Sequence, residues 1–249
     1  MMTAWDDLMS GEGVVLADGG MGTTLFSLGL DRGTAPELWN LERPDTIAEI
    51  HRGYIDAGAQ IILTNSFGGN RARLGRHKLA EKTREINRTA AKIARGEADA
   101  AEEAILVGGS LGPTGRLMEP LGDLSPAEAE SIFAEQASAM GVSPEDAVAN
   151  LADFNLSAIG ANCGNGPEEI EVVIVKMHAA APSKILVAKS NAGMPRLHEG
   201  KTTYDASPEI MAEHALRVSA LGARIVGACC GSTAEHIRAM SIAIRSHSE

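Results

Sequence analysis

The sequence predicts a parallel α/β fold arranged as a barrel, and three observations support this prediction. Short apolar runs alternate with amphipathic helical patterns along most of the chain. The apolar runs lack polar alternation, which is typical of parallel strands covered on both faces. A polar residue or a cysteine follows the end of each run, and in such barrels the functional site is built on the carboxyl ends of the strands. We expect one domain over residues 1–249.

Six apolar runs are predicted as strands. In chain order they are Val14–Ala17, Ile61–Thr64, Ile105–Gly108, Ala158–Ala161, Ile185–Ala188 and Arg224–Gly227. The helical patterns cover about Pro44–Ala57, Leu79–Ala98, Pro126–Met140, Pro144–Asp153, Pro167–His178, Pro208–Leu221 and Ala234–Ser246. Ser125 and Ser207 each stand before a proline, which is the chemistry of an N-cap followed by the first helical residue.

One junction breaks the alternation of strands and helices. The helix that ends near Met140 is followed at once by a loop and a new helix start around Ser143, with no strand between them. A barrel of this type has eight strands, and only six are evident. The sequence therefore indicates that part of the barrel is absent at the junction of residues 140 and 141.

Composition limits the classes of partner. The chain has 249 residues, with 22 Lys+Arg and 33 Asp+Glu, and a formal net charge of −11. An acidic chain without a basic cluster argues against binding of nucleic acid or anionic membranes. No apolar stretch approaches the roughly 18 residues of a membrane span. We expect a soluble cytoplasmic protein with small-molecule ligands, and the sequence leaves a homo-oligomer open.

All three cysteines lie at the ends of predicted strands. Cys163 ends one apolar run, and the pair Cys229 and Cys230 ends another. Adjacent side chains on a regular strand point to opposite faces, so this pair can converge only if the strand breaks there, which Gly231 permits. Three thiolates at one end of a sheet would form a Zn²⁺ site with its fourth position open, the pattern of a catalytic site. The alternative is three inert buried cysteines. A disulfide fits poorly with an odd count and two adjacent cysteines.

Six glycine-rich strings resemble, in order, the motifs of the zinc-dependent homocysteine S-methyltransferase family. They are Leu16–Thr23, Leu63–Gly68, Gly109–Gly115, Gly160–Pro167, Ser190–Pro195 and Gly227–Thr233. Ala35–Asn40 further resembles the bacterial betaine–homocysteine branch. The resemblance implies an α/β (β/α)8 TIM-type barrel with Zn²⁺ on Cys163, Cys229 and Cys230. It also implies transfer of a methyl group from an onium donor, betaine being favoured, to the thiolate of homocysteine, which gives methionine.

The resemblance also identifies what is absent at the junction. Members of this family carry strand 4, helix 4 and strand 5 there, about fifty residues in an eight-stranded barrel. That segment normally supplies an acidic residue for the homocysteine amino group and an aromatic residue for the donor. Either the sequence lacks residues that the natural protein has, or the chain is a deletion variant. In the first case the Cα atoms of Met140 and Gly141 would lie well beyond the 3.8 Å of bonded neighbours.

Four residues are candidates for substrate contacts. By resemblance, Asp18 contacts the homocysteine ammonium; its alternative role is a turn within its own loop. Gly19 would allow the backbone to approach the substrate closely, or only allow a tight turn. Asn162 would bond the amino-acid end or its own loop. Trp39 is the candidate for a quaternary ammonium through cation–π contact, and its alternative is packing over the barrel mouth.

Two other functions stay open. The same chemistry is compatible with S-methylmethionine, with another sulfonium donor, or with a corrinoid or folate partner in a larger assembly. A protein of another class, an inactive zinc- or thiol-binding deletion variant, would retain the same three cysteines.

Overall fold

The computed structural model describes residues 3–11, 13–140, 157–198 and 201–247. Its strands are β1 (Val15–Leu16), β2 (Ile61–Leu63), β3 (Leu106–Gly108), β4 (Ala158–Cys163), β5 (Ile185–Ser190), β6 (Arg196–His198), β7 (Lys201–Thr203) and β8 (Ala223–Ala228). Its α-helices are α1 (Ala4–Ser10), α2 (Met21–Ser27), α3 (Trp39–Glu42), α4 (Pro44–Asp56), α5 (Arg71–Gly75), α6 (Thr83–Asp99), α7 (Pro126–Ala139), α9 (Pro167–Ala180), α10 (Pro208–Ala220) and α11 (Ala234–His247). Two 3₁₀ turns, η1 (Pro36–Leu38) and η2 (Ala80–Lys82), precede α3 and α6.

The parallel strands form one continuous arc. Four of them pair in the order β1-β8-β5-β4, and β2 pairs with β3. Backbone hydrogen bonds join the two groups, because the Asp18 N–H donates to the Ile61 carbonyl and the Gln60 N–H to the Leu16 carbonyl. The carboxyl ends of all six strands therefore lie along one edge, as the sequence predicts.

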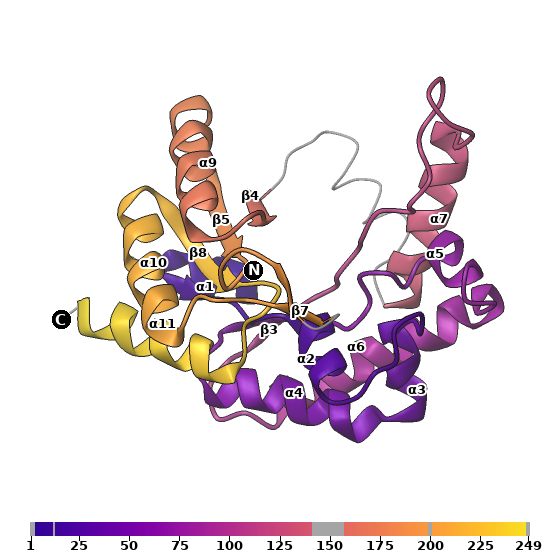
Figure 1. Cartoon of the computed structure of the whole chain (residues 1–249), viewed down its shortest axis with the longest axis horizontal. Coiled ribbons are helices and arrows are strands. Elements are labelled where there is room, and N and C mark those ends of the chain that lie inside the picture. The colour runs from indigo at the N-terminus through magenta and orange to yellow at the C-terminus, as the bar shows by residue number, and fades with distance from the viewer. Residues whose placement is uncertain (1–2, 12, 141–156, 199–200, 248–249) are drawn as a thin grey trace.

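The residues that the structure describes do not form the closed eight-stranded barrel that the resemblance implies. In the described part of the chain, β3 and β4 stand at the two ends of the arc and no strand pairing joins them. β4 and α9 lie on one side of the molecule and α7 on the other (Figure 1). The expected full burial of β4 is wrong, because all six of its residues are at least partly exposed. The physical reason is that β4 has a neighbouring strand on one side only.

The helix predictions are confirmed for the described residues, with boundaries that differ by one to a few residues. Ser125 and Ser207 cap α7 and α10, and each side chain accepts a hydrogen bond from a backbone N–H three residues on. The predicted helix at Pro144–Asp153 and the predicted Met140–Gly141 separation lie outside the described residues. No helix among the described residues is both long and apolar enough to cross a membrane.

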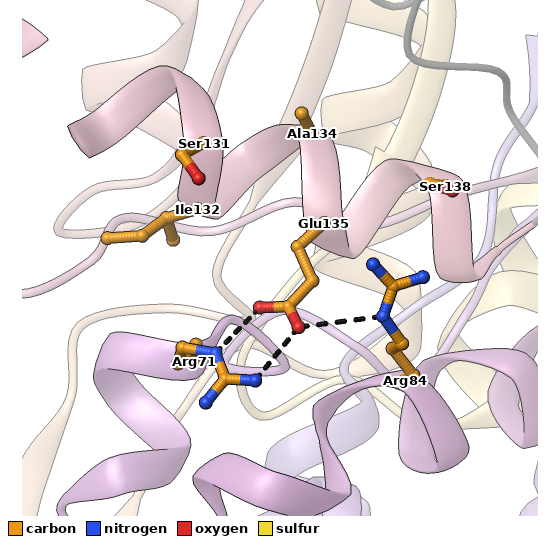
Figure 2. A pocket seen from close by; sticks show the side chains of 7 residues that line it. All are labelled: Arg71, Arg84, Ser131, Ile132, Ala134, Glu135 and Ser138. Atoms are coloured by element: carbon orange, nitrogen blue, oxygen red, sulfur yellow. Dashed lines mark hydrogen bonds and ion pairs between the residues drawn. The ribbon is translucent and has the colours of Figure 1, made fainter. Parts of the chain in front are cut away.

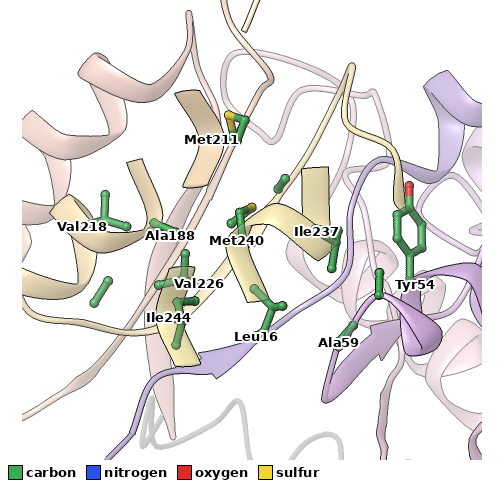
Figure 3. Close-up of a cluster of buried hydrophobic side chains, with 14 of the residues drawn as sticks. Leu16, Tyr54, Ala59, Ala188, Met211, Val218, Val226, Ile237, Met240 and Ile244 are labelled. Atoms are coloured by element: carbon green, nitrogen blue, oxygen red, sulfur yellow. The ribbon is translucent and has the colours of Figure 1, made fainter. Parts of the chain in front are cut away.

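The main core lies between the outer face of the arc and its helices (Figure 3). Ala188 and Val226 from neighbouring strands pack beneath Met211 of α10 and Met240 of α11, and all four side chains are fully buried. Burying a large apolar side chain contributes about 1.5–3 kcal/mol, so this layer holds α10 and α11 on the sheet. A smaller cluster fills the inner face and includes Val15, Ala17, Ile61 and Ile225.

The described residues contain eight strands rather than the six expected. The two additional strands, β6 and β7, form an antiparallel hairpin outside the parallel arc. This hairpin has no apolar run that would predict it, because its strands are polar and short, and Leu197 within it is 76% exposed.

Candidate metal centre

The three cysteine sulfurs converge at the carboxyl edge of the arc. The Sγ atoms of Cys163 and Cys229 lie 3.1 Å apart, and those of Cys229 and Cys230 lie 4.0 Å apart. All three sulfurs lie within 4.8 Å of one another, and all three thiols are free. The predicted convergence of Cys163, Cys229 and Cys230 is therefore confirmed.

Cys163 reaches the cluster through an uncommon backbone conformation. It is the last residue of β4, and its φ is +65°, in the left-handed region. Residues with a side chain rarely adopt this region, at a cost of about 1–2 kcal/mol. Such strain persists where the surrounding structure imposes it, and it is concentrated at functional sites. The conformation turns the chain at the strand end, next to the sulfur of Cys229.

Cys229 and Cys230 converge because the strand ends before them. β8 ends at Ala228, and Gly231 turns the chain with φ +83°. A Cβ atom at Gly231 would lie 2.2 Å from the ring of Tyr204, so a side chain there would be excluded by space as well as by conformation. The expected strand break at Gly231 is confirmed.

The loop after β5 connects the two cysteine loops. The Asn191 side chain donates to the Gly164 carbonyl at 2.7 Å and accepts from the Cys230 N–H at 3.1 Å. Backbone bonds add to this connection, since the Asn191 N–H donates to the Cys163 carbonyl and the Cys229 N–H to the Ser190 carbonyl. Sequence reasoning did not assign a role to Asn191. The signal available in the sequence was an asparagine just beyond a predicted strand.

The sulfurs share their protons unequally. Hydrogen bonds from the thiols of Cys163 and Cys230, together with the positive charge of Lys189, lower the pKa of Cys229. The bond with Cys229 raises the pKa of Cys163, and the bonds with Cys163 and Cys229 raise that of Cys230. The thiolate, which is the form that binds metals, is therefore favoured at Cys229 over the other two cysteines.

The spacing of the sulfurs fits a zinc ion. Three sulfurs at the corners of a tetrahedron with Zn–S bonds near 2.3 Å lie about 3.8 Å apart. The separations of 3.1 and 4.0 Å, with the third no longer than 4.8 Å, are close to this value. Thiolates also match the preference of zinc among biological ligands.

Asp18 lies on the inner side of the same edge and is 3% exposed. One carboxylate oxygen accepts a hydrogen bond from the Leu63 N–H at 2.7 Å, and the other forms an ion pair with the Lys189 ammonium. These partners come from β2 and β5, so the side chain is not engaged in a turn of its own loop. Sequence reasoning did not single out Lys189, although a lysine at the end of an apolar strand was a visible signal.

Gly19 and Asn162, two of the predicted substrate-binding residues, have different surroundings. A Cβ at Gly19 would lie 2.7 Å from the Ser232 hydroxyl and 2.8 Å from the Tyr54 ring, so this glycine is packed against protein groups. Asn162 is exposed, and its side chain donates to the Cys163 sulfur at 3.2 Å. The Asn162 side chain is thus beside the sulfurs, whereas Gly19 faces the protein interior.

Trp39 lies away from solvent. It is 5% exposed and packs with Leu25, Leu30 and Ile47. The Arg43 guanidinium lies over its ring, 4.4 Å from the centroid. The ring face is therefore occupied by a cation of the protein itself, which favours the packing role over a donor site.

A separate pocket of about 400 Å³ lies against α7, between Arg71 and Arg84 (Figure 2). Glu135 sits between the two guanidiniums and pairs with Arg71 at 2.9 Å and with Arg84 at 3.7 Å. The two positive charges are thus partly neutralised, and none of the three cysteines lines this pocket.

The chain is similar to a known protein family and to solved structures. Residues 15–141 and 138–244 match the model of the family described as homocysteine S-methyltransferase. The metallated form of the homocysteine methyltransferase MmuM from Escherichia coli has a similar structure, with a TM-score of 0.68 and 21% identity over 95% of this chain and 98% of that chain. Its oxidized form gives a TM-score of 0.65 at 22% identity, over 94% of this chain and 97% of that one. At this identity the likeness shows the shared fold.

Two methionine synthases are similar in sequence. The one from Mycobacterium leprae (strain TN) is 29% identical over 296 aligned positions, which cover 93% of this chain. The one from Mycobacterium tuberculosis (strain ATCC 25618 / H37Rv) is 28% identical over 303 positions and 96% of this chain. The chain spans only about a quarter of the length of these relatives, 24% and 25%. Because the family match covers most of the sequence, the chain belongs to the homocysteine S-methyltransferase family.

Proposed function

We propose that this protein transfers a methyl group from an onium donor to the sulfur of homocysteine and so forms methionine, with zinc held by Cys163, Cys229 and Cys230. The observation that carries the proposal is the convergence of the three sulfurs at the carboxyl edge of a parallel sheet. Membership of the homocysteine S-methyltransferase family supports the acceptor.

The chemistry requires a thiolate acceptor and a correctly oriented donor. A free thiol has a pKa near 8.5 and is mostly protonated at neutral pH. Zinc, when bound, would lower the pKa of the substrate thiol and favour its thiolate form. The three cysteine thiolates make the centre electron-rich, so it favours a positively charged donor whose charge disappears during transfer. The protein must then mainly hold the sulfur, the methyl group and the leaving atom in line.

For the acceptor, we propose that Asp18 binds the ammonium group of homocysteine. Its burial at 3% and its bond from the Leu63 N–H support a fixed carboxylate. Asn162, exposed beside the Cys163 sulfur, is proposed to contact the amino-acid end, and Gly19 to keep the first loop close to the site.

For the donor, betaine remains our proposal because Ala35–Asn40 resembles the betaine branch. S-methylmethionine, another sulfonium compound, or a corrinoid or folate partner are the alternatives. The similarity to methionine synthases extends over only a quarter of those proteins, so it does not select among these donors. A panel of these donors, each supplied with homocysteine and zinc, identifies the one from which methionine forms.

We also propose that the complete barrel contains residues absent from this chain between 140 and 141. The family match consists of two stretches that meet at 138–141. The M. leprae alignment has 296 positions but includes only 93% of 249 residues, about 232, so about 64 positions face gaps in this chain. The outer edges of β3 and β4, which pair with no other strand in the described part of the chain, support the same proposal.

The central experiment combines metal analysis with methyl transfer. We expect about one zinc ion per chain after purification under reducing conditions. Cys163→Ser, Cys229→Ser and Cys230→Ser should each lose most of the zinc and all transfer to homocysteine. Zinc binding without transfer from any donor would favour the inactive zinc-binding alternative, and full activity of any one variant would rule out the proposed centre.

A further inference from the structure

Lys189 is a buried lysine on the inner face of the parallel arc. It is 9% exposed. Along β5, Leu186 and Ala188 pack in the main core under the helices, whereas Val187 packs with the inner cluster. Side chains alternate between the two faces of a strand, so Lys189 points inward with Val187. Lysine is almost never buried without a partner.

The partner of Lys189 is Asp18, at the end of β1. The strand β8 lies between β1 and β5, and its residue in register with Lys189 is Gly227. Gly227 carries no side chain, and the Lys189 ammonium pairs with the Asp18 carboxylate across β8. Removing two charges from water offsets much of what a buried ion pair contributes, so stability alone is a weak reason for this pair.

Along the strands, Lys189 lies one residue before the level of Cys163 and two before that of Cys229. Lys189 is in register with Asn162 on β4, and the next residue of β4 is Cys163. On β8, Cys229 follows Gly227 by two residues. A ligand whose sulfur joins the cysteine cluster would therefore place its other end near Asp18 and Lys189.

We propose that Asp18 and Lys189 together form the site for the amino-acid end of the thiol substrate, with Lys189 binding the α-carboxylate. This inference deepens the proposed function and rests on it. An α-amino acid carries an ammonium and a carboxylate on one carbon, which are complementary to the two members of this pair. On binding, the substrate ammonium takes the place of the Lys189 ammonium at Asp18, and Lys189 swings on its flexible stem to the substrate carboxylate. Every charge is paired before and after binding, so no net charge is buried.

The test measures binding by calorimetry in the absence of a methyl donor, on the full chain loaded with zinc. Three thiols are compared: L-homocysteine, 3-aminopropane-1-thiol without the carboxylate, and 4-mercaptobutanoate without the ammonium. Lys189→Met should weaken homocysteine about 10- to 100-fold, the range for a lost hydrogen bond between charged groups. The same variant should bind 3-aminopropane-1-thiol at least as tightly as the wild type, because that thiol has no carboxylate to lose and no longer has to displace the Lys189 ammonium from Asp18. Lys176→Met, on the exposed face of α9, is the control and should change neither affinity.

Two outcomes overturn the inference. An equal loss of affinity for all three thiols would mean that Lys189 acts as a counter-ion of the sulfurs, and unchanged affinities would mean that it only neutralises Asp18. If Lys189→Met fails to fold because Asp18 is left unpaired, the double variant Asp18→Asn/Lys189→Met removes both charges. It should bind the three thiols with similar affinity; a wild-type preference for homocysteine in this variant refutes the proposal. Absence of thiol binding by the wild-type protein would instead refute the proposed function itself.

Discussion

Asn191→Ala should uncouple the two cysteine loops. Asn191 is 5% exposed, and its side chain makes two hydrogen bonds, to the Gly164 carbonyl and from the Cys230 N–H. Removing the amide takes away the partner of the Gly164 carbonyl, on an exposed residue, and of the Cys230 N–H, on a half-buried one. A hydrogen bond contributes about 0.5–1.5 kcal/mol, so we expect a loss of about 1–3 kcal/mol in the free energy of unfolding.

The same substitution should weaken metal binding. The Asn191 side chain bonds to both of the loops that carry Cys163 and Cys230. Changes to groups that orient metal ligands typically reduce metal affinity about 10- to 100-fold. Competition with a chromophoric chelator measures this affinity, and urea unfolding with and without zinc measures stability. The increase in the free energy of unfolding on adding zinc should be smaller in the variant, because bound metal stabilises the folded state according to its affinity.

The control for this experiment is Asn165→Ala, at an exposed position in the loop after Cys163. Only the backbone N–H of Asn165 has a described bond, to Glu169, so loss of its side chain should leave zinc affinity unchanged. If Asn191→Ala binds zinc as tightly as the wild type, the Asn191 side chain does not position the cysteines for metal binding.

Three further predictions concern single side chains. Asp18→Asn should raise KM for homocysteine in a steady-state assay with unchanged zinc content, and an unchanged KM would exclude a role in ammonium binding. Trp39→Leu should lower the free energy of unfolding by about 2–4 kcal/mol, because the indole fills a buried cluster; a rise in KM for betaine equivalent to about 1–2 kcal/mol, at unchanged stability, would instead assign the ring to the donor. Burial lowers the pKa of His51 below its model-compound value of 6.5, with Asp18 and Glu97 opposing this shift. On acidification the unfolded chain therefore takes up the proton first. The contribution of His51 to the free energy of unfolding is fully present above pH 6.5 and falls below it by at most about 1.4 kcal/mol per pH unit. Urea unfolding at about pH 7.5 and about pH 5.5 measures this loss of stability, and His51→Leu should make it smaller. An equal loss in the variant and the wild type would contradict the prediction.

The strands and cysteines were predictable because their signals are local. Apolar runs bounded by glycine and polar residues mark buried parallel strands, and each of the six runs overlaps a described strand. The convergence of Cys229 and Cys230 followed from a single glycine, since Gly231 adopts the positive φ that the turn requires. The hairpin of β6 and β7 carries no such signal because it is polar and exposed.

The partners of the site residues were not predictable, because they depend on strand order. Lys189 meets Asp18 across 171 positions of sequence, and only the pairing order β1-β8-β5 brings them together. Asn191 acquires its role because β5 lies between the two strands that carry cysteines. Trp39 was a candidate on its chemistry alone, and burial with Arg43 over its ring is a property of the tertiary packing.

The last prediction concerns the junction at residues 140 and 141. Among the described strands, β3 and β4 each have a partner on one side only, and Gly160 and Asn162 of β4 are exposed. Exposed edges of parallel strands are sites of aggregation and of pairing with other chains. Two further strands between β3 and β4 would close the arc into the eight-stranded barrel of its family.

We therefore expect the protein isolated from its natural source to be heavier than the 26.0 kDa of this chain. About fifty additional residues correspond to about 5 kDa, and intact mass spectrometry resolves this difference. In the longer protein, the outer backbone amides of β4 should be protected from hydrogen exchange. In the 249-residue chain they should exchange rapidly, because none of the strands that the structure describes covers them. A natural mass of 26.0 kDa with protected β4 amides would refute the missing segment. Another partner, for example a second copy of the chain, would then cover the outer edge of β4.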